Sequence, residues 1–155
     1  MIVGIDPGQT GGIAGIQPTG GCVARPMPVT GKDIDGHAIA AELRALAPEV
    51  VILEKVHAMP KQGVSSTFKF GMGFGLVIGV CEALGIPYRL VTPQSWKKVV
   101  LAGTAKDKDA AISFVRRAYP AVDLTPGRKR VPHDGMADAV CLAEYGRVLM
   151  NRGAA

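Results

Sequence analysis

The chain has 155 residues, 48% of them apolar and 20% charged, so it can bury a core and is too apolar to be disordered. Its 18 Lys and Arg exceed its 13 acids and give a net charge of +5, which alone favours a nucleic-acid partner only weakly. Its three cysteines form neither a zinc pattern nor a disulfide framework. We see no signal peptide, and the glycine-rich stretch 70–86 is too interrupted to span a membrane. We therefore expect a soluble protein of a reducing, intracellular compartment.

The first third of the chain predicts three antiparallel strands and a helix. Residues 2–6 and 12–16 are apolar runs joined by a Pro-Gly turn. Residues 21–29 form a third strand, which must lie at an edge because its prolines cannot donate to a central ladder. A helix over residues 36–46 follows, with Asp35 as its N-cap.

The rest of the chain alternates strands and helices. The β-branched run 50–54 is typical of a strand buried on both faces. A long helix then runs from a serine cap at Ser65 or Ser66 to Leu84, and the later elements are a strand at 87–92 and helices at 93–101, 107–119 and 134–150. Right-handed crossovers make neighbouring strands parallel. The sequence thus predicts one α/β domain, residues 1–155, with a mixed five-stranded sheet (a three-strand meander plus parallel strands) and helices on both faces.

Four acids stand where a catalytic site could form. Asp6 ends the first strand and Glu54 ends the buried strand, while Asp134 and Asp138 are one turn apart on the last helix. Each has an ordinary alternative: a turn residue, a surface residue, a helix cap for Asp134 and an arginine partner for Asp138. If the two strands are neighbours, however, the acids converge, and like charges at close range need a cation. Oxygen ligands suit Mg²⁺ or Mn²⁺, and two such ions can cleave a phosphodiester.

Four segments, in order, carry a family resemblance: GIDPGQTGGIAGI, VVILEKV, VTPQSWKK and HDGMADAVCLAEYGR. They resemble the RuvC-type Holliday junction resolvases, most closely the short branch carried by bacteriophages. The resemblance implies a ribonuclease H-like fold, a homodimer, and paired nicking of four-way DNA junctions with two divalent ions per active site. It also implies that Asp6, Glu54 and Asp138 are metal ligands, and that the protein acts in the cytoplasm of a bacterial or phage-infected cell, at the nucleoid.

The chain departs from the family at the fourth metal ligand. Many members place this ligand three residues before the last aspartate, where this sequence has Gly135. Asp134 is the obvious substitute, and His133 is the second choice. The family also places an aromatic wedge just beyond the glutamate, and His57 stands there. His57 either stacks on a base or is an exposed loop histidine.

Lysines gather after the predicted parallel strands, on the edge where ligands bind in such sheets. A nuclease needs positive charge there to hold phosphates against its own acids. The alternative is that they are ordinary solvated lysines. With His57, the predicted DNA contacts are Lys55, Lys61, Lys69, Lys97, Lys98, Lys106 and Lys108.

Glycines recur along the long helix at Gly71, Gly75 and Gly79. Each costs about 1 kcal/mol relative to alanine inside a helix, so the stripe needs a compensating close contact. That contact is either the protein's own sheet or a second copy of helix 65–84, and the family resemblance favours the dimer.

Two other classes of protein fit parts of the sequence. The motif GIDPGQTGG also resembles the first phosphate loop of actin-like and sugar-kinase-like ATP-binding modules. Those proteins close two such domains around the nucleotide, and 155 residues are too few for two. A non-catalytic DNA-binding domain of the same fold is the other alternative, and the loss of an acid would indicate it.

Overall fold

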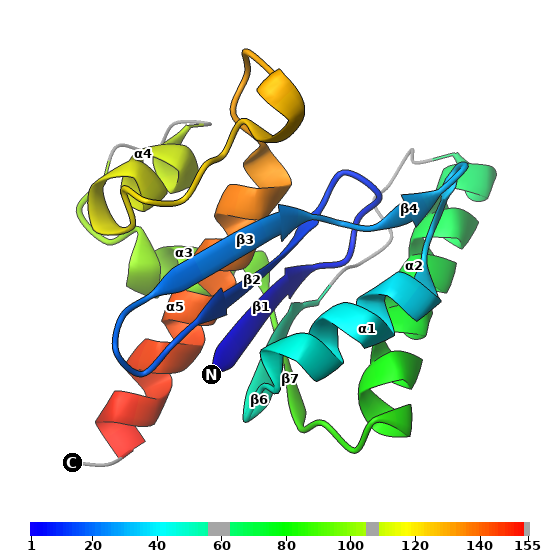
Figure 1. Ribbon diagram of the computed structural model, residues 1–155, viewed down its shortest axis with the longest axis horizontal. Helices are drawn as coiled ribbons and strands as arrows, with labels where there is room; N and C mark the ends of the chain where they lie inside the picture. The colour runs from blue at the N-terminus through cyan, green and yellow to red at the C-terminus, as the bar shows by residue number, and fades with distance from the viewer. Residues whose placement is uncertain (56–62, 105–108, 154–155) are drawn as a thin grey trace.

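The computed structural model describes residues 1–55, 63–104 and 109–153. A five-stranded sheet in the order β3-β2-β1-β6-β7 forms its centre (Figure 1). Strands β1, β2 and β3 make an antiparallel meander, and β6 runs parallel to both β1 and β7. The mixed sheet with β3 at its edge confirms the sequence prediction. The strands are Ile2–Asp6 (β1), Gly12–Ile16 (β2), Cys22–Pro26 (β3), Val50–Glu54 (β6) and Tyr88–Val91 (β7).

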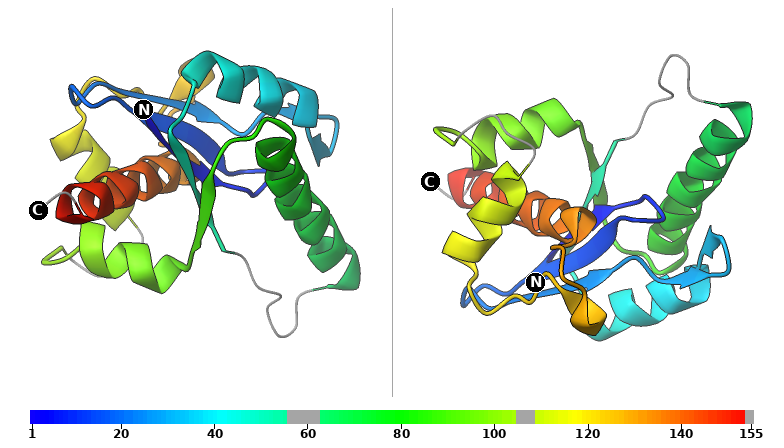
Figure 2. Two further views of the ribbon diagram at one scale, coloured as in Figure 1. Left: turned by 90° about the horizontal axis from the view of Figure 1, so that it is seen from below. Right: turned by 90° about the horizontal axis from the view of Figure 1, so that it is seen from above.

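Helices cover both faces of this sheet, as predicted (Figure 2). One face is covered by α1 (Gly36–Leu46) and α2 (Val64–Ala83). The other is covered by α3 (Pro93–Val100), α4 (Ala110–Ala118) and α5 (Asp134–Gly153). Because strand side chains alternate between faces, the apolar strands feed two separate cores, one under each helical layer.

The predicted cap of the first helix is confirmed, and α3 (Pro93–Val100) is capped in a similar way. The Asp35 side chain accepts a hydrogen bond from the Ala38 amide at 3.0 Å and so begins α1. Thr92 accepts from the Ser95 amide at 3.3 Å, and Pro93 occupies the first turn of α3.

Other boundaries differ from the prediction. Gly63, not a serine, caps α2, and it does so without a side-chain hydrogen bond. Helix α4 begins at Ala110, later than expected, and the predicted start at residue 107 lies outside the described residues. The structure adds a small hairpin, β4 (Val29–Thr30) and β5 (Asp33–Ile34), and a 3-10 turn, Pro126–Arg128. Such short elements carry no hydrophobic period that the sequence could reveal.

Helix α5 lies directly against the backbone of β1. A Cβ atom added to Gly4, in the middle of β1, would overlap the backbone of Ala139 and Ala143 on α5. The missing side chain therefore lets the helix approach the strand closely, and this places the first half of α5 over the carboxyl end of β1.

We predict that Gly4→Ala lowers the free energy of unfolding by about 3 kcal/mol, because its new methyl group overlaps helix backbone that cannot rotate away. Gly21→Ala is the matched control, since its nearest neighbours are atoms of the flexible Gln17 side chain. We expect the control to change stability by less than about 0.5 kcal/mol. Urea denaturation of both variants measures the difference, and similar small effects in the two would show that α5 does not approach β1 so closely.

Candidate functional site

Three half-buried carboxylates meet at the carboxyl ends of β1 and β6. The strands pair in parallel with Ile5 opposite Leu53, so the residues that follow, Asp6 and Glu54, end neighbouring strands at the same edge. Asp138 comes from the first half of α5, which crosses this edge. The structure thus brings together acids that are far apart in the sequence, as predicted.

Burial and the charges of neighbouring carboxylates raise the pKa values of two of these acids. Burial raises the pKa of Asp138 to about 7, and repulsion from Asp6 adds to the shift. Burial also raises the pKa of Asp6 to about 6, with a further contribution from the charge of Glu54. Lys97 opposes both shifts without cancelling them. The site therefore holds more negative charge than its own residues neutralise.

The glycine-rich loop between β1 and β2 fits tightly around Asp6. A Cβ on Gly11 would overlap the Asp6 carbonyl oxygen, and the Gly8 amide donates a hydrogen bond to Asp6 Oδ1 at 3.3 Å. The Gly11 amide in turn donates to the Gly8 carbonyl at 2.8 Å and closes the turn. These glycines let the loop turn back sharply and orient the Asp6 carboxylate.

The same loop explains why the chain has a glycine at the fourth position expected for the family. A Cβ on Gly135 would overlap the backbone of Thr10 and Gly11, so no side chain fits there. Asp134, one residue earlier, is exposed in the first turn of α5. Its charge makes the smallest of the contributions to the raised pKa of Asp138.

His133, the second choice for the fourth metal ligand, has a structural role instead. Its Nδ1 accepts a hydrogen bond from the Met136 amide at 3.2 Å, and its carbonyl accepts from the Ala137 amide. His133 therefore caps α5, which is the structural role that the sequence allowed for Asp134. Because its neighbour supplies the cap, the exposed Asp134 carboxylate is not needed to begin α5, and its charge contributes to the raised pKa of Asp138.

These acids converge without forming a closed cage. Within residues 1–55, 63–104 and 109–153, no three His, Cys, Asp or Glu side chains are gathered tightly enough to hold a metal ion as they stand. Carboxylates with raised pKa values are nevertheless a donor set that suits a hard divalent cation, because the cation would remove their mutual repulsion.

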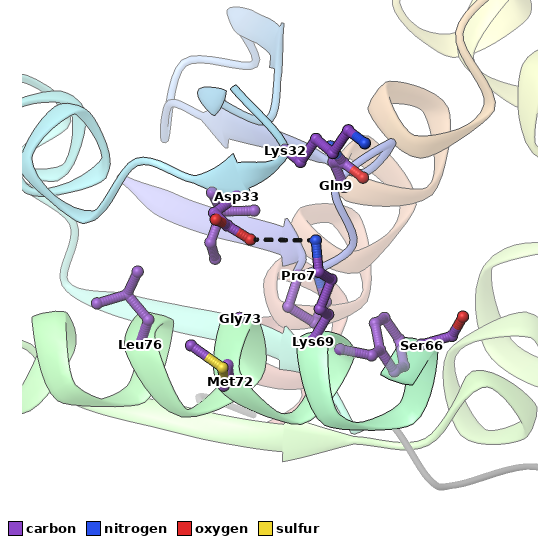
Figure 3. Close-up of a pocket in the computed structure, with 11 residues that line it drawn as sticks. Pro7, Gln9, Lys32, Asp33, Ser66, Lys69, Met72, Gly73 and Leu76 are labelled. Carbon is purple, nitrogen blue, oxygen red and sulfur yellow. Dashed lines mark ion pairs between the residues drawn. The ribbon is translucent and has the colours of Figure 1, made fainter. Parts of the chain in front are cut away.

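The predicted DNA-contacting residues lie in different parts of the molecule. Lys97 lies near the acids, as its effect on their pKa values shows, and its exposed neighbour Lys98 follows on α3. Lys55 is exposed directly after Glu54. Lys69 instead forms an ion pair with Asp33 at 3.8 Å (Figure 3). His57, Lys61, Lys106 and Lys108 lie outside the described residues.

Lys69 and Asp33 line a groove of about 640 Å³ between α2 and the β4–β5 hairpin. Figure 3 shows Lys69 reaching across its opening toward Asp33, while Met72 and Leu76 lie further along α2. The groove begins at Pro7, next to Asp6, so it adjoins the acidic edge.

The outer face of α2 carries the glycine stripe. A Cβ added at Gly71, Gly75 or Gly79 would meet nothing within 4 Å, whereas Gly73 touches Ile34 of β5. The alternative that the stripe packs on the protein's own sheet is therefore wrong. Beside the stripe, Phe68 is 68% exposed and is one of several exposed apolar side chains on α2.

By length and composition, α2 is the one helix of the described residues that could cross a membrane. The sequence predicts no membrane span here, because glycines interrupt its apolar stretch. A single such helix is weak evidence for membrane insertion. Its Val77 and Cys81 are buried in the core beneath α1 and α2.

Trp96 is the site residue that sequence reasoning missed. It is fully buried in the core. Its indole Nε1 also donates a hydrogen bond to Glu54 Oε1 at 2.8 Å. A contact across 42 positions leaves no signal in the sequence, because nothing local distinguishes a packed tryptophan from one that also holds a carboxylate.

Similarity to known proteins agrees with this geometry. No protein-family model matches the chain. Over 117 residues it is 29% identical to the crossover junction endodeoxyribonuclease RuvC of Nitratidesulfovibrio vulgaris strain DP4, which covers 76% of this chain and 68% of that protein.

Solved structures share the fold. Thermus thermophilus RuvC in complex with a Holliday junction substrate aligns with a TM-score of 0.71 at 17% identity, over 98% of this chain and 95% of that one. The yeast mitochondrial Holliday junction resolvase aligns with a TM-score of 0.57 at 15% identity, over 93% and 76% of the two chains. The chain is therefore similar in sequence to a RuvC endodeoxyribonuclease and shares the ribonuclease H-like fold of solved Holliday junction resolvases.

Proposed function

We propose that this protein is a crossover junction endodeoxyribonuclease, a structure-selective nuclease that resolves four-way DNA junctions in recombination and repair. The observation that carries the proposal is the convergence of Asp6, Glu54 and Asp138 at one sheet edge, with raised pKa values for both aspartates. Its relatives are bacterial, and a role on DNA in the cytoplasm, at the nucleoid, follows from the same proposal.

RuvC-like resolvases in general depend on divalent metal ions. In this chain we assign the ligands as Asp6, Glu54 and Asp138, with Asp134 completing the set at the rim, for two Mg²⁺ ions that Mn²⁺ can replace. When bound, the ions would activate a water and stabilise the leaving oxygen of the cleaved phosphodiester. Asp134 is preferred to His133 because the Nδ1 of His133 already caps α5.

The chain's own cations would hold the DNA backbone against these acids. The strongest candidates are Lys97, whose charge reaches the acids, and the exposed Lys98 and Lys55, which directly follow Lys97 and Glu54 in the chain. Lys69 would first have to leave Asp33. The remaining proposed contacts, outside the described residues, are His57, Lys61, Lys106 and Lys108.

We predict that Glu54→Gln abolishes junction cleavage and leaves junction binding intact, because the amide keeps an acceptor for Trp96 and loses only the charge. A junction extruded from a supercoiled plasmid measures paired nicks, and a gel shift in Ca²⁺ measures binding. Linear duplex and an RNA–DNA hybrid serve as substrate controls and should resist cleavage. Equal losses of cleavage, binding and thermal stability would instead give Glu54 a purely structural role.

A twofold dimer fits this activity. Resolution needs nicks at two symmetry-related positions, and two protomers joined by a self-complementary interface present two sites at once. The outer face of α2 is the surface we assign to that interface. Its glycines leave room for another backbone, and exposed Val64, Phe68 and Met72 supply apolar area beside them.

We predict that Gly75→Leu shifts the protein toward monomer, because the added side chain overpacks the contact by about 1–3 kcal/mol. Paired nicking of the plasmid should then fall more steeply than single nicking. Ser113→Leu, an equivalent enlargement at an exposed position of α4, is the control and should change neither property. Sedimentation at low concentration gives the oligomeric state. A Gly75 variant that stays dimeric and linearises the plasmid normally would move the interface elsewhere.

The raised pKa values predict how metal-free stability depends on pH. The folded pKa of Asp138, about 7, lies above the ordinary aspartate value of 3.8, so the folded state binds the proton more tightly than the unfolded state does. This contribution to stability is complete below about pH 4 and is lost as pH rises through 7.

In EDTA we therefore expect thermal unfolding to show lower stability at pH 8 than at pH 5, and Asp138→Asn to exceed wild type at pH 8 by about 2 kcal/mol. Mg²⁺ should stabilise wild type at pH 8 and have much less effect on the variant. Asp33→Asn is the control, because Asp33 is an exposed acid that pairs with Lys69 and is not among the groups that shift the pKa of Asp6 or Asp138. Wild-type stability that rises from pH 5 to pH 8 in EDTA would contradict the assignment.

A further inference from the structure

Trp96 links the core to the acidic site through one hydrogen bond. It is the only tryptophan of the chain, and it is fully buried in the core beneath α3, α4 and α5. Its indole Nε1 donates to Glu54 Oε1 at 2.8 Å. The donor is therefore held rigidly, while the acceptor is a half-buried carboxylate at the sheet edge.

We propose that Trp96 is a positioning residue that fixes the Glu54 carboxylate in the orientation a divalent metal ion requires. This inference rests on the proposed function. The buried indole engages Glu54 Oε1, Oε2 takes no part in this hydrogen bond, and the charge of Glu54 reaches Asp6. Partners of this kind, which hold a ligand rather than the metal, typically change metal affinity 10-fold to 100-fold when they are removed.

Glu54 has a physical reason to need such a partner. A glutamate side chain has three rotatable bonds, and the charge of neighbouring Asp6 repels it. Without a bound cation, that repulsion would drive the Glu54 carboxylate toward solvent. The indole N–H opposes this movement, because leaving it would strand a buried donor without a partner.

The fold places the indole there by way of two adjacent elements. Strand β7 pairs with β6 so that Val91 lies opposite Glu54, and α3 begins immediately after β7 at its Thr92 cap. Trp96 lies one helical turn after this cap, and its indole reaches the Glu54 carboxylate. The ring cannot turn away without opening the core.

The same indole also supports the next residue. Lys97 Nζ lies 5.1 Å from the centre of the Trp96 ring, within range of a cation–π interaction. Lys97 is the cation whose charge reaches both Asp6 and Asp138. One buried side chain thus orients an acid through its N–H and a base through its ring face.

A purely structural role makes a different prediction. If the bond to Glu54 only satisfies a buried donor, its loss should lower stability and leave metal affinity unchanged. Metal affinity, rather than cleavage, therefore decides between the two roles.

The test compares two replacements of Trp96. Trp96→Phe removes the donor together with part of the ring. Because the chain has one tryptophan, biosynthetic incorporation of the benzothiophene analogue replaces only the N–H with sulfur and keeps the shape. This second variant keeps the test decisive if Trp96→Phe does not fold. Calorimetry with Mn²⁺ alone should show that both variants bind the ion at least about 10-fold more weakly than wild type.

Val115→Ala is the matched control, since Val115 is fully buried in the same core cluster and lies on α4. It should lower the melting temperature and change Mn²⁺ affinity by less than about twofold. Wild-type affinity in both Trp96 variants would overturn the positioning role. Wild-type protein that neither binds Mn²⁺ nor cuts junctions would overturn the proposed function as well, so the two failures are distinguishable.

Trp96 also gives a spectroscopic signature. Mg²⁺ titration of wild type should change the tryptophan emission with the same midpoint as metal binding, because metal binding alters the charge felt by the indole N–H. Glu54→Gln should abolish this response and shift the resting emission, because it removes the charge beside the indole permanently. Emission that ignores Mg²⁺ in a metal-binding wild type would contradict the link between Trp96 and the metal.

Discussion

The contact between the α5 backbone and the β1–β2 unit is the constraint on which the site depends. Side chains are missing where the two surfaces meet: a Cβ on Gly4 or Gly135 would overlap backbone of the facing element. Because the helix can approach the sheet this closely, Asp138 comes near enough to Asp6 for the Asp6 charge to raise its pKa. Larger residues would lift α5 and separate the acids.

Closeness of this kind opposes stability. Burial and mutual repulsion both raise the pKa of Asp138, so its ionised form weakens the metal-free fold. The arrangement persists because cores on both faces of the sheet hold the strands and α5 in place. Lys97 relieves part of the repulsion, and the rest is available to favour a bound cation.

Periodicity and chain order were enough to predict the sheet and its helices. The convergence of Asp6 with Glu54 depended on a condition, that their strands are neighbours, which the parallel pairing of β1 with β6 meets. Details that depend on contacts between distant segments were not predictable. Whether Asp134 or His133 caps α5 is settled only by the hydrogen bond to the Met136 amide, and the need for glycine at 135 comes from a loop about 125 residues earlier. The bond from Trp96 to Glu54 belongs to the same class, because no local pattern encodes it.

Helix α2 shows why one face could not be assigned from sequence. It is apolar around its whole circumference, so hydrophobicity does not distinguish the side that meets the sheet from the side that does not. The structure uses Gly73, Val77 and Cys81 inside and leaves Gly75 open. An exposed glycine weakens a helix, and an exposed apolar face favours association. Both features disadvantage an isolated chain, yet they are what two helices need to approach closely, which is why the proposed dimer accounts for them together.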